Sequence, residues 1–278
     1  MNKTSRIMIG LLAATCLGFI GSPFCALAQS GVTVEARGLR IVGAGVGDDF
    51  QDSVRPFNWN EGTSVALLIR RAEGGITKID RDASSVTVFQ DNTGTDLLKQ
   101  PEQNGGKTMF SSQGGIGMMP QLKKDGTAAM VELEGPGLPA RGATTLKAQG
   151  TIALVCASTK KQFTQEIELK VGSKVTVGPV PLEITKVGKP DWGNAAMAVT
   201  LTATQPLDAI AAIGFSSQGA KIETHDGGQS SMKAFNQLKV EKTINFDKKV
   251  DSATIEIDAW QDLKHIKVPF DLTIGVGL

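Results

Sequence analysis

The chain has 278 residues, of which 41% are hydrophobic and 21% are charged, and its formal net charge is +1. This composition is typical of a folded globular protein, and the balanced charge argues against a nucleic-acid-binding surface. Tyr is absent and His occurs only twice. The chain therefore has few of the side chains that commonly carry acid–base catalysis or bind zinc.

The first residues have the three parts of a secretory signal peptide. Lys3 and Arg6 precede an apolar stretch at 7–20, and small residues follow in the sequence Ala26-Leu27-Ala28. The apolar stretch is shorter than the ~20 residues that a membrane-spanning helix needs. We therefore predict cleavage after Ala28, a secreted or periplasmic location and no transmembrane segment in the mature chain.

The mature chain shows the alternation of apolar and polar residues that is typical of β-strands. Val65, Leu67 and Ile69 share one face of such a strand, and the same pattern recurs along the chain between Gly, Asp, Asn and Pro residues. Residues 207–213 are ambiguous, because a helical turn and a buried strand fit them equally well. The single cysteine of the mature chain, Cys156, lies on the apolar face of its strand and is expected to be buried and inert.

An internal repeat relates two segments at a constant offset of 103 residues. Ile152, Leu154 and Cys156 match Ile255, Ile257 and Ala259, and the apolar register continues without a gap to Gly172 and Gly275. Less regular matches link residues 37–42 with 181–187, and 59–69 with 192–203. The repeat predicts an all-β fold of two tandem Ig-like β-sandwich domains, at 29–172 and 173–278. The first domain carries an insertion at 99–120.

Four sequence segments carry a resemblance to a wider group of proteins. These are FNWNEGTSVALLI, GLPARGATTL, GKPDWG and the final VPFDLTIGVGL. With them, nearly all of the mature chain resembles uncharacterised families of tandem β-sandwich proteins exported by bacteria. The resemblance implies the fold and transfers no catalytic motif.

Several polar clusters have ordinary structural explanations. The segment from Asp91 to Asp96 fits a tight turn better than a calcium loop, because it lacks the EF-hand spacing. A solvated acidic loop is likewise favoured over a calcium site for Asp48, Asp49 and Asp52. His225 and Asp226 lie in a Gly-containing turn with no nucleophile elbow nearby. No cofactor or metal site is expected.

The three tryptophans lead to different expectations. Trp59 and Trp192 precede matching strands, so we expect both to pack against their domains. The alternative is that they are platforms on which sugar rings stack. Trp260 has no aromatic counterpart, because the offset places Ala157 there. We therefore expect Trp260 to be an exposed binding residue.

The insertion is the strongest candidate for a binding surface. Its sequence is rich in Gly, which favours a loop, and it carries apolar side chains that suit adaptable contacts. The alternative is a flexible loop whose apolar residues cap one end of the sandwich. The candidate binding residues here are Met109, Phe110, Ile116, Met118 and Met119.

The sequence favours a non-catalytic binding or scaffold protein of the cell envelope or exterior over an enzyme. An envelope protein or a polysaccharide is the expected partner, and nucleic acid is not. The alternative is a hydrolase that uses two loop carboxylates on an extracellular polysaccharide, because such a pair leaves no sequence motif.

Overall fold

Every regular element of the described structure is a β-strand. The computed structural model describes residues 31–43, 61–99, 114–117, 119–190, 192–235 and 237–276, and the strands in these ranges pair antiparallel. The prediction of an all-β protein is therefore confirmed. The ambiguous segment 207–213 contributes to a strand that begins at Ile210. Within the described ranges, no helix is long and apolar enough to cross a membrane.

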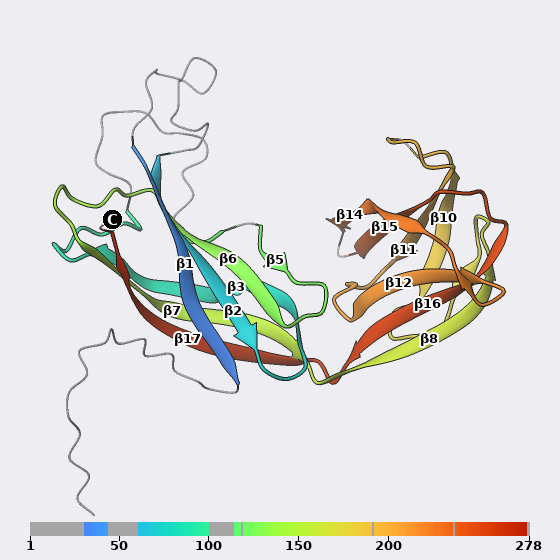
Figure 1. Cartoon of the computed structure of the whole chain (residues 1–278), viewed down its shortest axis with the longest axis horizontal. Coiled ribbons are helices and arrows are strands. Elements are labelled where there is room, and N and C mark those ends of the chain that lie inside the picture. The colour runs from blue at the N-terminus through green and yellow to red at the C-terminus, as the bar shows by residue number, and fades with distance from the viewer. Residues whose placement is uncertain are drawn as a thin grey trace, which may run out of the picture.

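The strands form two lobes that are joined at a narrow crossing (Figure 1). In lobe 1, one sheet has the strand order β1-β2-β6-β4, with β5 also paired to β6, and the other has the order β17-β7-β3. The strands of lobe 1 are β1 (Val32–Val42), β2 (Gly62–Arg71), β3 (Gly75–Asp91), β4 (Gly115–Ile116), β5 (Gln121–Leu122), β6 (Ala128–Gly135), β7 (Thr145–Ala157) and β17 (Lys264–Gly275).

Lobe 2 contains the remaining strands, also in two sheets. Their orders are β14-β15-β11-β10-β9 and β13-β12-β16-β8. The strands are β8 (Thr159–Glu168), β9 (Lys174–Val175), β10 (Leu182–Gly188), β11 (Met197–Ala203), β12 (Ile210–Ser217), β13 (Ala220–Lys221), β14 (Thr224–Ala234), β15 (Gln237–Phe246) and β16 (Ser252–Gln261).

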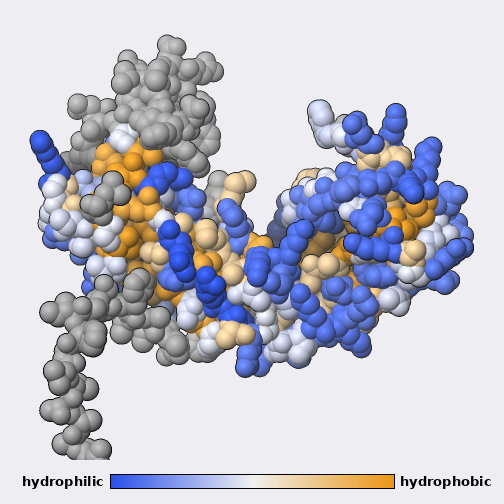
Figure 2. All heavy atoms as spheres, in the orientation of Figure 1, coloured by the Kyte–Doolittle hydropathy of each residue, from blue (hydrophilic) through white to orange (hydrophobic). Residues whose placement is uncertain are grey.

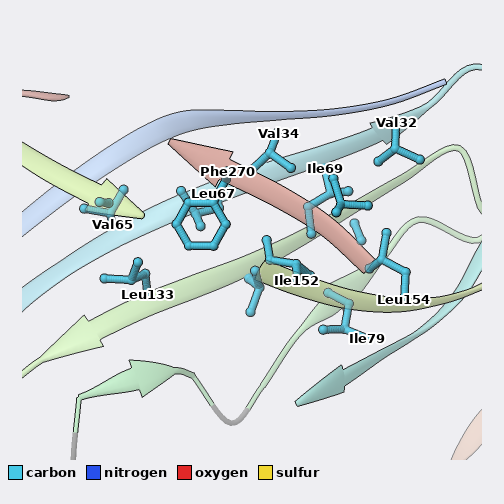
Figure 3. Close-up of a cluster of buried hydrophobic side chains, with 14 of the residues drawn as sticks. Val32, Val34, Val65, Leu67, Ile69, Ile79, Leu133, Ile152, Leu154 and Phe270 are labelled. Atoms are coloured by element: carbon cyan, nitrogen blue, oxygen red, sulfur yellow. The ribbon is translucent and has the colours of Figure 1, made fainter. Parts of the chain in front are cut away.

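Each lobe has its own apolar core between its two sheets, an arrangement consistent with a β-sandwich. The alternation seen in the sequence places Leu67 and Ile69 of β2 inward, where they meet Ile152 and Leu154 of β7 (Figure 3). Each such side chain contributes roughly 1.5–3 kcal/mol by leaving water. Lobe 2 is built in the same way, and the rings of Phe215 and Phe246 meet there with centroids 4.9 Å apart.

The chain passes between the lobes twice, through a continuous two-stranded ribbon. One strand of the ribbon is β7 followed by β8, and the other is β16 followed by β17. Thr159 pairs with Gln261 in lobe 2, and three residues further along each strand Cys156 pairs with Lys264 in lobe 1. The register is therefore unchanged across the crossing.

This ribbon places the division between the two cores away from the predicted boundary at Gly172. Strand β8 precedes that boundary, but its residues Ile167 and Phe163 pack in the core of lobe 2. Strand β17 follows the boundary, but Val268 and Phe270 belong to the core of lobe 1. The described residues of lobe 2 thus form one segment, 159–261, that is enclosed by the sequence of lobe 1. Apolar periodicity correctly predicted strands such as β2, β11 and β17. It does not reveal which half of the chain a strand joins.

The two lobes have corresponding strand orders. Strands β1, β2 and β6 of lobe 1 occupy the positions of β10, β11 and β15 in lobe 2, and β3, β7 and β17 occupy those of β12, β16 and β8. The edge position beside β6 is shared by β4 and β5, whereas β14 occupies the equivalent position beside β15. The insertion predicted at 99–120 therefore leads into an edge of lobe 1 that has a counterpart in lobe 2.

We expect residues 159–261, expressed alone, to unfold cooperatively on heating with a β-type circular dichroism spectrum. All described strands of lobe 2 and its whole buried cluster lie within this segment. Residues 173–261 are the matched control, because they lack β8 and should not fold. A fragment 159–261 without a cooperative transition would show that lobe 2 depends on lobe 1.

Candidate functional site

The two lobes meet at a joint formed around the ring of Trp260. This residue belongs to β16 of lobe 2 but is only 7% exposed, so the expectation of an exposed binding residue is wrong. Its ring lies against Gly75 and Gly126 of lobe 1, where an added Cβ would come within 2.3 Å and 2.8 Å of ring atoms. The absence of a side chain at both glycines is what allows this close approach.

Polar contacts complete the joint. Within lobe 2, Lys160 is the cross-strand neighbour of Trp260 and places its Nζ 4.1 Å from the centroid of the ring, a cation–π contact. Lys78 of lobe 1 forms an ion pair with Asp208 of lobe 2, with 2.9 Å between Nζ and Oδ2. Because both side chains are partly exposed, this pair adds at most about 1 kcal/mol. The Trp260 ring is therefore the main contact between the lobes at this point.

A cavity of about 300 Å³ lies beside the joint and has residues of both lobes in its walls. Val155, Pro206 and Leu263 make part of the lining apolar, and His265 lies at the same cavity. His265 is exposed. In the described part of the chain, no three His, Cys, Asp or Glu side chains are grouped closely enough to hold a metal ion.

We expect Gly75→Ala to weaken the joint, because the new methyl group would overlap the Trp260 ring. The variant should melt at a lower temperature and should shift its tryptophan fluorescence to longer wavelength as Trp260 becomes wetter. Gly188→Ala is the matched control, since nothing lies within 4 Å of a Cβ at that strand position. A variant at Gly75 with unchanged melting and emission would contradict the close fit described here.

Four of the large apolar side chains that are exposed in the described residues lie at two equivalent sheet edges. We name Met119 and Leu122 of lobe 1, with Met232 and Phe235 of lobe 2, the edge surface. Met119 is 89% exposed and Phe235 is 102% exposed, the latter at the tip of the β14–β15 hairpin with a φ of 48°. Apolar side chains that are exposed together indicate an interaction site more strongly than a single exposed residue does.

The two parts of the edge surface lie on the facing sides of the lobes. Strand β5 and the β14–β15 hairpin border the gap between the lobes in Figure 1, and Figure 2 shows this gap as a notch in the surface. The carboxyl of Asp226 in β14 is partly buried, and burial alone would raise its pKa. Hydrogen bonds from Lys242 and Gly228 act in the opposite direction, as do the positive charges of Lys242 and Lys124, and together they outweigh the effect of burial. The pKa is thus lowered. Lys124 follows β5 in lobe 1, so a charge on one edge contributes to lowering the pKa of a carboxyl on the other.

The other candidate binding residues have mixed outcomes. Ile116 lies in β4, half-buried, and packs against the core of lobe 1, which fits the capping alternative. Met109, Phe110 and Met118 lie outside the described residues, as do Trp59 and the acidic residues Asp48, Asp49 and Asp52. Trp192 is 89% exposed, so the expectation that it packs against its domain is wrong.

Two carboxylates beside β4 interact with each other on β6. Burial and the neighbouring Glu132 raise the pKa of Glu134, although Arg40 and Arg81 act against this. Arg40 forms an ion pair with Glu132, with 2.9 Å between the Nη2 and Oε2 atoms. Sequence inspection missed these two residues because an i, i+2 pair of glutamates on a strand resembles any solvated strand face.

His225 and Asp226 lie in strand β14, so the predicted turn at this place is wrong. The two residues do not form a dyad with each other. His225 pairs with Asp247, at 3.0 Å, and Asp226 pairs with Lys242, at 2.6 Å. Cys156 is buried as expected, and burial raises the pKa of its thiol, although interactions with Arg71 oppose the change. A thiol with a raised pKa is a poor nucleophile at neutral pH.

Asp91 has a structural part in the turn that was predicted from Asp91 to Asp96. Its carboxylate accepts hydrogen bonds from the backbone N–H groups of Thr93, Thr95 and Ala140 and from the Thr93 hydroxyl. Burial alone would raise its pKa, but these hydrogen bonds hold the pKa far below the ordinary value of 3.8. The turn interpretation therefore accounts for this acidic residue.

We expect Asp91→Ala to lower the free energy of unfolding by about 2–3 kcal/mol at neutral pH, because it leaves buried N–H groups without an acceptor. The native pKa is lowered, so the stabilisation is complete above 3.8 and is lost as the pH falls below that value. Denaturant unfolding of both proteins across this range is the measurement. A stability difference that does not narrow in acid would contradict this assignment.

Comparison with known proteins adds no relative from which a site could be transferred. No family model matches the chain, and neither a curated protein nor a solved structure does.

Proposed function

We propose that this protein is an exported, non-catalytic binding or scaffold protein of the cell envelope or exterior. In this proposal it consists of two Ig-like β-sandwich domains from a tandem repeat, and it holds an envelope protein across the edge surface. The signal-peptide pattern of residues 1–28 supports export to the periplasm or the cell exterior. The equivalent strand orders of the lobes support the repeat.

One observation carries the proposal of binding. Large apolar side chains are exposed at the same topological position in both lobes, on edges that face each other. Core packing does not explain them, because they lie in water. Two apolar contacts on opposite walls suit a partner that lies between the lobes and touches both. A protein segment fits this apolar surface better than a polysaccharide does, because the hydroxyl groups of a polysaccharide need hydrogen-bond partners.

The combined substitution of Met119, Leu122, Met232 and Phe235 by Ser should abolish recovery of the partner without changing stability. Each apolar side chain buried against a partner contributes roughly 1.5–3 kcal/mol before ordering costs are subtracted. The tagged full chain would be expressed in its own cells, crosslinked and purified with the partner from the envelope. We expect at least a tenfold loss of recovery and a melting temperature within about 2 °C of the parent.

A matched control replaces two other exposed apolar residues, Val171 and Trp192, by Ser. This variant should retain the partner. Equal recovery with the edge-surface variant and the parent would refute the proposed surface. A large fall in the melting temperature of the edge-surface variant would show instead that these residues stabilise the fold.

The alternative function is a loop-based carboxylate hydrolase acting on extracellular polysaccharide, and one observation, on strand β6 and not on a loop, bears on it. The raised pKa of Glu134 beside Glu132 is a property that a general acid requires. The same purified protein, incubated with envelope polysaccharide, distinguishes the two functions. Release of reducing sugar that Glu134→Gln abolishes would favour the hydrolase.

A further inference from the structure

Strands β8 and β17 occupy equivalent places in opposite lobes. The offset of 103 residues makes them counterparts, matching Phe163 with Ile266 and Ile167 with Phe270. The side chains of β8 pack in the core of lobe 2, and those of β17 pack in the core of lobe 1. Each half of the chain thus contributes this strand to the lobe formed mainly by the other half.

We propose that β8 and β17 are exchanged between the two halves of the chain, and that each half is also able to close on its own strand. In this proposal, Gln165 and the residues at the crossing, which are Ser158, Thr159, Gln261 and Asp262, stabilise the exchanged form relative to the closed form. Under the offset, Ser158 is the counterpart of Gln261, and the N–H of Ser158 donates to the carbonyl of Gln261 at 3.2 Å. Two equivalent residues that bond to each other mark a local two-fold axis at the crossing.

The closed form follows from the same register. Cys156 now pairs with Lys264, whose counterpart is Lys161, so closure would pair Cys156 with Lys161. The loop between β7 and β8 would then consist of Ser158 and Thr159 alone. In the other half, the equivalent loop would consist of Gln261 and Asp262.

The loop Ser158-Thr159 has an unfavourable sequence for a two-residue hairpin, whereas Asp262 of the other loop already has a φ of 55°. Two-residue hairpin turns require positive φ values and are typically Asn-Gly or Asp-Gly. Thr159 is β-branched and disfavours positive φ, and neither loop contains glycine. Short loops that cannot turn easily favour an extended hinge and strand exchange.

Gln165 adds a second preference for the exchanged form. In lobe 2 its side chain donates to the carbonyl of Lys174 and accepts from the N–H of Thr176, both at 2.9 Å. Its counterpart in lobe 1 is Val268, which is buried. Closure would move Gln165 to the place of Val268, where its amide would lose both partners among apolar side chains.

The exchange holds the lobes together independently of the proposed binding function. In the closed form only the short connection after β8 would join the lobes. The contact of Trp260 with Gly75 and Gly126 and the ion pair between Lys78 and Asp208 would both be lost. The strand exchange is thus the device that sets how the two lobes face each other.

Cutting the chain between β8 and β9 tests this proposal. A protease site inserted after Gly172, an exposed glycine with nothing within 4 Å of a Cβ, allows the folded full chain to be nicked. The parent's two pieces should stay together in gel filtration without denaturant, because each holds a strand of the other. Separation of the parent's pieces would overturn the exchange.

The variant S158N/T159G/Q261N/D262G/Q165V should close each half on itself. After nicking, its two pieces should separate while the β-type spectrum is retained. A control with Ala at the four loop positions and Gln165 kept should behave as the parent does. If the five-site variant no longer shows the β-type circular dichroism spectrum, it has not folded, and the variant that changes only the four loop residues is nicked instead. Pieces of a folded variant that stay together would overturn the proposal.

Discussion

The unchanged register of the ribbon is the constraint on which the rest of the molecule depends. Strands β7 and β8 remain paired with β17 and β16 from one lobe into the other. Because a slip of one residue would turn every side chain to the opposite face, both cores fix this register together. The place where the ribbon leaves lobe 1 also determines where Trp260 meets the two glycines of that lobe.

The two lobes differ most where they are least constrained. Core positions in corresponding strands keep similar apolar residues, such as Val65 and Leu67 in β2 and Val199 and Leu201 in β11, because both sandwiches need them. The edge beside β6 is divided into the short strands β4 and β5, whereas β14 is a single strand with an irregularity between Asp226 and Gln229. Short or bulged edge strands discourage uncontrolled pairing between molecules. Because backbone pairing is discouraged at these edges, a partner that binds there contacts side chains.

Much of this fold could be predicted from local sequence patterns, and the exchange could not. The alternation around Leu67 and Ile152 predicted buried strands, and the offset of 103 residues matched strands that are equivalent in the structure. The same apolar face serves in either lobe, so the pattern of β17 carries no information on which core receives it. The burial of Trp260 was not predicted because the space for its ring depends on Gly75 and Gly126, which are distant from it in sequence. The exposed Phe235 has no sequence signature, since its environment is set by a hairpin tip.

The nested position of lobe 2 in the sequence has a consequence for the order of assembly. Residues 159–261 can pair among themselves as soon as they are available, whereas β7 waits for β17, more than 100 residues further along the chain. Closing such a long-range pair is slow relative to local pairing. During that interval, one edge of β7 lacks its partner strand and the side chains that Val268 and Phe270 later cover are open to water. Lobe 1 is therefore the part of the molecule most exposed to aggregation while the chain folds.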